Sequence, residues 1–199
     1  MNVISNVLYW ISTGLLVPVI VLLIFFFIRA LVLVGAFFGQ YMHQRKASDA
    51  LRRAVDGIAE SGTAASDNAL PAASASVAAA YARRIVAAAG QPARIDLLLS
   101  EFELDADKNV STSRVLTKMG PILGLMGTLI PMGPALVGLA AGDIASMAYN
   151  MQVAFATTVV GLVVSAIGFL TQQAKERWAV RDLATLEFLA ETVKQKGAL

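Results

Sequence analysis

Three long stretches of the chain contain no charged side chain, and they limit what the chain can fold into. They span residues 1–28, 119–142 and 144–174. A helix of about 20 apolar residues is long enough to cross the hydrocarbon core of a bilayer, and each stretch exceeds that length. Core helices of soluble domains seldom lack charges over such a length. The sequence therefore predicts an all-α integral membrane protein with three transmembrane helices and long cytoplasmic helical extensions.

The composition excludes several other classes of protein. Charged residues make up 15% of the chain and hydrophobic residues 57%, whereas soluble domains carry about 25% charged residues and disordered chains are polar. The absence of cysteine excludes disulfides, cysteine-ligated metals and thiol catalysis. His43 is the only histidine and has no second ligand at a suitable spacing, so we predict a solvated side chain and no metal or other cofactor.

The first uncharged stretch is expected to be a retained transmembrane helix rather than a cleaved signal peptide. It has no basic segment at its start, and its apolar run is longer than the core of a signal peptide. Tyr9 and Trp10 suit the aromatic belt at one interface, and Arg29 lies about 20 residues further on, at the other. We expect Arg29 to be an interfacial anchor; a buried functional charge is the alternative.

The lysine and arginine residues predict the orientation in the membrane. Apart from Arg29, all of them lie within residues 45–118 or 175–196. Basic residues concentrate on the cytoplasmic side, so we expect a multi-pass protein of the plasma (inner) membrane with its N-terminus outside and its C-terminus in the cytoplasm. Because these residues mark topology and form no basic stripe, no nucleic-acid partner is expected.

These boundaries divide the chain into six segments. They are an outer tail and first transmembrane helix with a cytoplasmic extension (1–42), a cytoplasmic helical region (43–116), the second transmembrane helix (117–142), a short outer hairpin (143–149), the third transmembrane helix (150–174) and a cytoplasmic C-terminal helix (175–199).

Within the cytoplasmic region, helical patterns surround one polar linker. The linker is expected at residues 61–76, which are small and polar. Asp105 or Asp107 is expected to cap a separate helix that continues into the second span. The other helices are predicted at residues 43–60, at residues 77–89, where Gly90 and Pro92 end an alanine-rich run, and at residues 93–104.

Small residues recur along one face of each of the last two spans. Steps of three and four place them on a single side of a helix, where they let helix backbones approach closely. They either pack the two spans against each other, or line a pore or accept a foreign helix. In the second span, the prolines also favour irregular backbone. The residues are Gly120, Gly124, Gly127, Pro131, Pro134 and Gly138, and then Ala154, Thr158, Gly161, Ser165 and Gly168.

Polar side chains are few in these two spans, and none carries a charge. Thr128, Thr157 and Thr158 lie at depth. A threonine in a transmembrane helix often bonds its own backbone, while the alternative is a hydrated ion path along Thr128 and Thr158. Because a proton relay needs a titrating group, usually a carboxylate, this chain cannot relay protons alone. Another polypeptide would have to supply the carboxylate.

Two motifs resemble the MotA/TolQ/ExbB proton channel family. Met119–Leu129 (MGPILGLMGTL) is similar to the family's small-Pro-Φ-x-GLxGT signature at the start of the second span, where Φ is apolar. Phe155–Leu162 (FATTVVGL) is similar to its Ala-Thr-x-x-Gly-Leu signature in the third. The predicted topology agrees, and three spans point to the ExbB/TolQ branch, since MotA-like members have four.

The resemblance implies a channel-forming subunit of an energy-transducing or stator complex driven by an ion-motive force. Thr128 and Thr158 match threonines that line the pore in relatives, where they face an essential Asp on a single-span partner similar to ExbD or TolR. Five copies of the channel subunit typically surround two partner helices. Relatives drive outer-membrane uptake, envelope integrity, gliding or flagellar torque, and the work done here stays open, as does the choice between H⁺ and Na⁺.

Two positions depart from the family pattern. Many ExbB/TolQ-like chains have a glutamate five residues before the third-span threonine, where this chain has Val153. The Pro131 and Pro134 pair is also unlike the commonest members. Both departures concern the details of the ion path.

Other function classes find less support in the sequence. A stand-alone small channel or transporter would normally show paired repeats or a charged site, and a purely structural membrane scaffold is a further alternative. An enzyme is not expected, because an intramembrane serine protease needs His or Lys at depth and a nucleotide-driven pump needs a phosphate loop.

Overall fold

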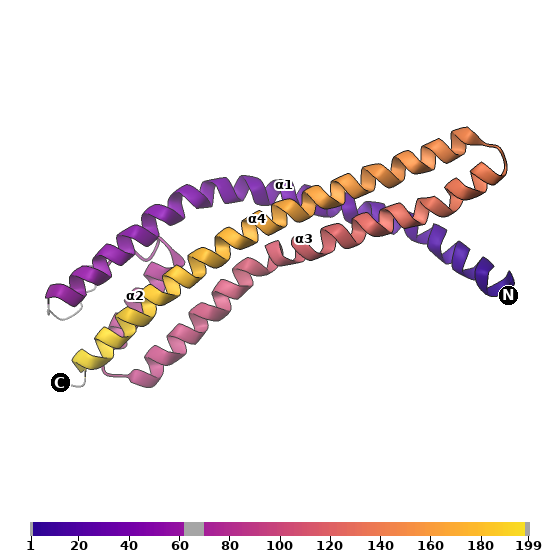
Figure 1. Ribbon diagram of the computed structural model, residues 1–199. Coiled ribbons are helices and arrows are strands. Elements are labelled where there is room, and N and C mark those ends of the chain that lie inside the picture. Colours follow the sequence, from indigo (N-terminus) through magenta and orange to yellow (C-terminus); the bar gives the residue numbers. More distant parts are fainter. Residues whose placement is uncertain (1, 62–69, 198–199) are drawn as a thin grey trace. The chain divides into compact units, whose positions relative to one another are not determined.

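The computed structural model describes residues 2–61 and 70–197, which form four α-helices and no strand (Figure 1). The helices are α1 (Asn2–Ser61), α2 (Val77–Ala87), α3 (Pro92–Ala140) and α4 (Ile144–Gly197). Three of them, α1, α3 and α4, are long and apolar enough to cross a membrane. The predicted all-α fold with three spanning helices is confirmed, and α2 is a short additional helix.

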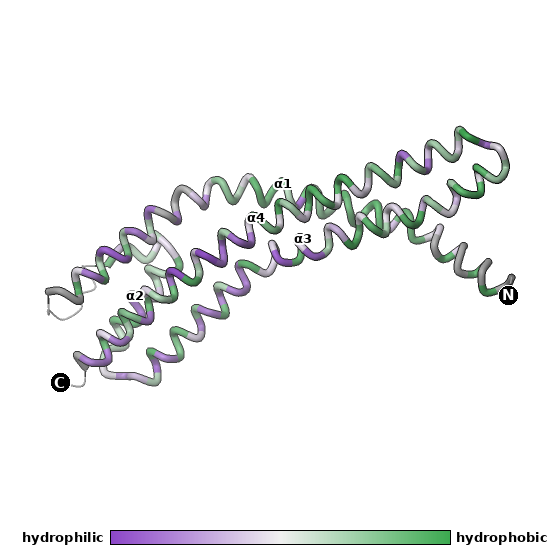
Figure 2. Tube along the Cα trace, in the orientation of Figure 1, coloured by the Kyte–Doolittle hydropathy of each residue, from purple (hydrophilic) through white to green (hydrophobic). Residues whose placement is uncertain are grey.

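The described helices divide into two compact units. The first comprises Met1–Gly35 and Thr112–Gln172, and the second Ala36–Ser111 and Gln173–Leu199. The helix segments of the first unit carry most of the hydrophobic residues, and those of the second carry most of the hydrophilic ones (Figure 2). The chain thus separates a part suited to lipid from a part suited to water.

In the first unit, α1 packs against both helices of the α3–α4 hairpin. Val19 and Leu23 of α1 are buried against Leu123 of α3. Further along, Ala30 is fully buried beside Leu116 and Val164. Most of the large apolar side chains outside these contacts are exposed, as expected of helices whose outer faces contact lipid or other subunits.

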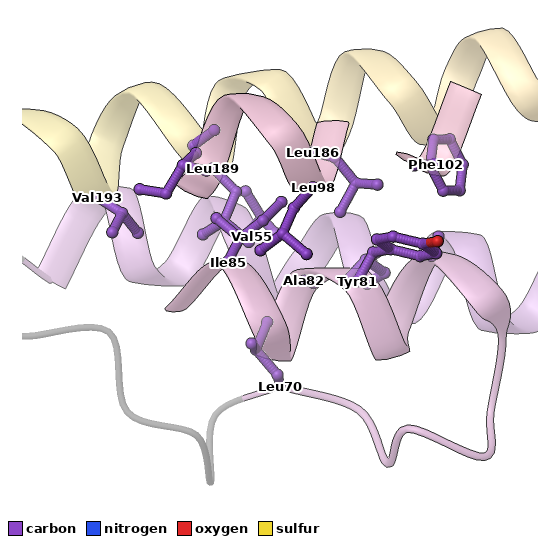
Figure 3. Close-up of a cluster of buried hydrophobic side chains, with 14 of the residues drawn as sticks. Val55, Leu70, Tyr81, Ala82, Ile85, Leu98, Phe102, Leu186, Leu189 and Val193 are labelled. Carbon is purple, nitrogen blue, oxygen red and sulfur yellow. The ribbon is translucent and has the colours of Figure 1, made fainter. Parts of the chain in front are cut away.

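The second unit has a conventional hydrophobic core to which all four helices contribute. Val55 of α1, Ile85 of α2, Leu98 and Phe102 of α3, and Leu186 of α4 meet in it (Figure 3). The ring of Tyr81 packs edge-on against Phe102 with ring centroids 5.5 Å apart. Burial of such side chains stabilises a fold in water by about 1.5–3 kcal/mol each.

The ends of α2 follow the rules that predicted them. The hydroxyl of Ser76 accepts a hydrogen bond from the N–H of Ala79 at 3.1 Å, which caps the first turn. After Ala87 the chain turns through Gly90, whose φ of 82° suits glycine, and α3 begins at Pro92. The prediction of a helix stopped by Gly90 and Pro92 is confirmed.

The cap predicted at Asp105 or Asp107 is wrong. α3 continues through both positions into the second span, and the carboxylate of Asp105 accepts a 2.7 Å hydrogen bond from the hydroxyl of Tyr81 instead. Tertiary packing of α2 on α3 therefore outweighs the local capping preference. α3 also continues through Pro131 and Pro134, where irregular backbone was expected.

The connection between α3 and α4 is tighter than the predicted hairpin of residues 143–149. α4 begins at Ile144, because the Asp143 carboxylate accepts a hydrogen bond from the N–H of Ser146 at 3.0 Å and so caps the helix. Gly142 takes a φ of 75°, which allows the sharp turn.

Some predicted features lie outside the described residues. Residues 62–69 of the predicted linker are among them, and so are the side chains of Tyr9 and His43. Leu70, just after this gap, is described and lies buried in the core of the second unit.

The core of the second unit predicts a clear difference between two positions of α2. Ile85→Ala removes a fully buried side chain and should lower the free energy of unfolding by about 2–5 kcal/mol. Val77→Ala is the matched control, because Val77 is exposed on the same helix. Thermal unfolding of the purified protein, followed by circular dichroism, should give a markedly lower midpoint for Ile85→Ala only. Equal midpoints would contradict this core.

Candidate functional site

The small residues of the two spans bring the backbones of α3 and α4 into direct contact. A Cβ atom placed on Gly161 would lie 2.6 Å from the carbonyl oxygen of Gly120 and 2.8 Å from the Cα of Gly124. A Cβ atom on Gly120 would likewise lie 2.6 Å from the carbonyl oxygen of Gly161. No real side chain fits at such distances, so glycine is required on both helices.

The contact extends along the hairpin in both directions. A Cβ atom on Gly127 would lie 2.6 Å from the side chain of Thr157, and one on Gly168 would lie 2.6 Å from the backbone nitrogen of Thr117. Between these points the hydroxyl of Ser165 donates a 2.9 Å hydrogen bond to the carbonyl oxygen of Thr117. This bond crosses between the helices, which is a recurrent use of serine in transmembrane packing.

The other predicted small residues fall on or beside the same contact. Gly138 lies near the turn, and a Cβ atom placed on it would lie 3.2 Å from the carbonyl oxygen of Asp143. Ala154 and Pro131 are buried and Pro134 is half-buried. The small residues were expected either to pack the two spans against each other or to line a pore or accept a foreign helix. This geometry favours packing within the chain's own hairpin, because the glycine faces are occupied by the opposite helix.

The three predicted threonines occupy two different environments. Thr157 is buried in the hairpin, and its hydroxyl donates to the backbone of Val153 and Ala154. Thr128 and Thr158 are half-buried at the edge of the hairpin contact. Thr128 follows the buried Gly127 and Thr158 follows the buried Thr157, and one residue turns the helix by about 100°. Thr128 and Thr158 therefore remain accessible from outside the hairpin, whereas Thr157 does not.

The hydroxyl protons of these edge threonines are already engaged. Thr128 donates to the carbonyl oxygen of Leu125 at 2.7 Å, and Thr158 donates to that of Ala154 at 3.1 Å. A hydroxyl has one proton and two acceptor lone pairs. Each threonine thus offers its oxygen as an acceptor to any group that comes alongside, such as a protonated carboxyl or a cation.

The segments of α3 and α4 that hold these threonines carry no charged side chain. The segments 119–142 and 144–174 have no charged side chain, and Asp143 is exposed in the turn. Arg29 of α1 is also exposed. Among the side chains that the structure describes, no group of three or more His, Cys, Asp or Glu residues could hold a metal ion.

The second unit contains a polar cluster that the sequence did not predict. Asp182 is buried, and its carboxylate accepts hydrogen bonds from Ser48 at 2.7 Å and Gln44 at 2.9 Å. Burial raises the pKa of Asp182, against the effect of these two hydrogen bonds and of Arg181.

Lys175 lies two turns before Asp182 on the same side of α4. It is buried and donates to the backbone and side-chain oxygens of Asn109 at 3.2 and 3.3 Å. Burial lowers the pKa of Lys175. Both residues line a cavity of about 330 Å³ in the second unit. Lys175 and Asp182 are seven residues apart, and the same helical periodicity continues to the buried Leu186 and Leu189. This periodicity was the signal that could have revealed the cluster.

The model of the MotA/TolQ/ExbB proton channel family matches residues 87–186, which is half of the chain and includes all of α3 and most of α4. No curated protein and no solved structure matches the chain.

The hairpin geometry predicts that Gly161 tolerates no side chain. Gly161→Ala should lower the stability of the purified protein by about 1–3 kcal/mol, the usual range for overpacking, because the added methyl would collide with backbone atoms of α3. Gly35→Ala in the same unit meets nothing within 4 Å and should be neutral or slightly stabilising. Thermal midpoints in one detergent test this pair. A tolerated Gly161→Ala would exclude the close contact.

The buried Asp182 predicts a pH-dependent stability. Because its pKa is raised in the folded protein, its contribution to stability is fully present below the ordinary value of 3.8 and is lost as the pH rises through the raised pKa. Asp182→Asn should flatten this part of the stability profile. Thermal midpoints measured from pH 4 to 7 test the expectation, with the exposed Glu187→Gln as control. Parallel profiles for the wild type and Asp182→Asn would refute it.

Proposed function

The chain belongs to the MotA/TolQ/ExbB proton channel family, and from this premise we propose that it is the channel-forming subunit of a stator or energy-transducing complex driven by the proton-motive force. The observation that carries the proposal is that segments 119–142 and 144–174 of the α3–α4 hairpin, within the family match, have no charged side chain, with Thr128 and Thr158 at the edge of their contact. Such a pair of segments can line an ion path without binding the ion tightly, because it carries no opposite charge.

The spanning segments of α3 and α4 lack a charged side chain, and this absence indicates what the partner must supply. Because segments 119–142 and 144–174 have no charged side chain, the proton carrier belongs to another polypeptide. We propose a single-span protein similar to ExbD or TolR whose intramembrane Asp faces Thr128 and Thr158. In the assembly, five copies of this chain surround two copies of that partner, and the three spanning helices support membership of the ExbB/TolQ branch.

The proposed orientation places the charged second unit in the cytoplasm. Apart from Arg29, the basic residues lie within residues 45–118 or 175–196, which favours a cytoplasmic location for both stretches. The N-terminus and the α3–α4 turn then lie outside the plasma (inner) membrane. The exposed Arg29 suits an anchor at the inner interface.

In the proposed mechanism, the partner's Asp takes up a proton from outside and passes Thr128 and Thr158 in its neutral form. A protonated carboxyl donates a hydrogen bond, and the two hydroxyls accept it because their own protons are held by Leu125 and Ala154. One proton that crosses 100 mV releases about 2.3 kcal/mol. Five subunits around two partner helices make successive positions unequal, so that each proton can drive a step of rotation.

Removal of both hydroxyls tests the ion path. Thr128→Ala combined with Thr158→Ala should reduce proton flux about tenfold or more in membranes that contain the chain and its Asp-bearing partner, because two neutral hydrogen bonds are lost and each contributes about 0.5–1.5 kcal/mol. The double serine variant keeps both hydroxyls and should retain the flux. If the double alanine variant keeps flux and coupled work intact, the assignment of these threonines is wrong.

A further inference from the structure

α3 carries an exposed apolar ridge in the second unit, formed by Leu97 and Leu104. These side chains are 58% and 72% exposed. They are seven residues apart, so they lie on one side of the helix, opposite the side from which Ile95, Leu98 and Phe102 reach the core. The second unit is the charged part of the chain, which makes lipid an unsuitable cover for this ridge.

A groove between α1 and α4 lies elsewhere on the same unit. It has a volume of about 320 Å³ and is lined by Arg52, Val55, Asp56, Arg181, Ala184, Thr185 and Phe188. Val55 belongs to the core and forms an apolar floor, and Phe188 is 51% exposed. The groove therefore has an apolar floor and a mainly basic rim.

The ridge and the groove have complementary charges. The α3 segment of residues 92–108 holds five acidic and two basic residues, and the exposed Glu103 flanks Leu104. The groove holds two arginines and one aspartate. Opposite charges around an apolar contact favour association and fix its register.

Leu104 and the groove also lie at the same level along the helices of this unit. Asp96 pairs with Lys194 at one end, and Asn109 binds Lys175 at the other. Leu104 of α3 therefore lies at the level of α4 between these contacts, where Ala184 and Phe188 line the groove. Copies related by rotation about an axis parallel to the helices of this unit meet at equal levels.

We infer that the ridge of one copy docks against the α1–α4 face of the next copy, with Leu104 in the groove. Two different complementary surfaces make a heterologous contact, which closes into a ring when repeated with a suitable rotation. The inference rests on the proposed function, because it assigns a subunit contact of the proposed ring to the part of the chain outside the spans.

Cysteine cross-linking tests this contact directly, because the chain has no cysteine of its own. The variant Leu104→Cys/Ala184→Cys, oxidised in native membranes, should give a ladder of covalent oligomers. Each single variant should give none, since ridge and groove face different sites on the neighbour. Leu104→Cys paired with Ala87→Cys, an exposed position on α2, is the matched control and should also give none.

The other outcomes each overturn the inference. Dimers of the Leu104→Cys single variant would mean that two ridges meet, and a cross-link to a different protein would mean that the groove serves another partner. Native mass spectrometry of the same chain separates the two proposals. Oligomers without a ladder overturn the docking and leave the proposed function intact, whereas monomers alone overturn both.

Discussion

The direct contact between the backbones of α3 and α4 is the constraint on which the membrane part of this protein depends. Lipid tails are as apolar as leucine, so helices in a bilayer gain little from hydrophobic burial and associate through close packing. Gly120 and Gly161 allow that packing because neither has a Cβ atom. α1 then packs on the surface that the joined helices present, through Leu123 and Val164. The hairpin also fixes which threonines stay accessible.

In the second unit the helices are held together by hydrophobic burial rather than by close backbone contact. It has few close glycine contacts and instead buries large side chains such as Leu51, Ile95 and Leu189 in a shared core. In water this burial supplies the stabilisation that is missing in lipid. α3 and α4 thus carry small residues where they pack against each other in the first unit and large apolar residues where they pack in the second.

Much of this arrangement could be predicted from the sequence, because the signals were periodic and strong. The uncharged stretches identified the spans, and the spacing of Gly120, Gly124 and Gly161 identified a packing face. The sequence could not decide what covers that face, since a helix of the same chain and a helix of another chain require the same small residues. The geometry favours the former for the glycines. The roles of Thr128 and Thr158 stay predictions.

The failures of prediction came from tertiary contacts between distant residues. Asp105 has the residue type of a helix cap, but Tyr81 of α2 takes its carboxylate, and α3 continues. Lys175 was counted only as a charge that marks the membrane side and Asp182 was not singled out, whereas both are buried. Their partners Asn109, Ser48 and Gln44 lie at least 60 residues away in the chain, beyond any local pattern.

The hydrogen bonds of the two edge threonines limit what can move past them. Both hydroxyl protons are held by backbone carbonyl oxygens, so that only lone pairs face a passing group. Lone pairs repel a carboxylate and attract a neutral carboxyl or a cation. In the proposed complex, the threonines therefore favour the protonated state of the partner's Asp, and the charged state must find its counter-charge elsewhere. An uncharged housing of this kind selects the loaded carrier without itself binding the proton.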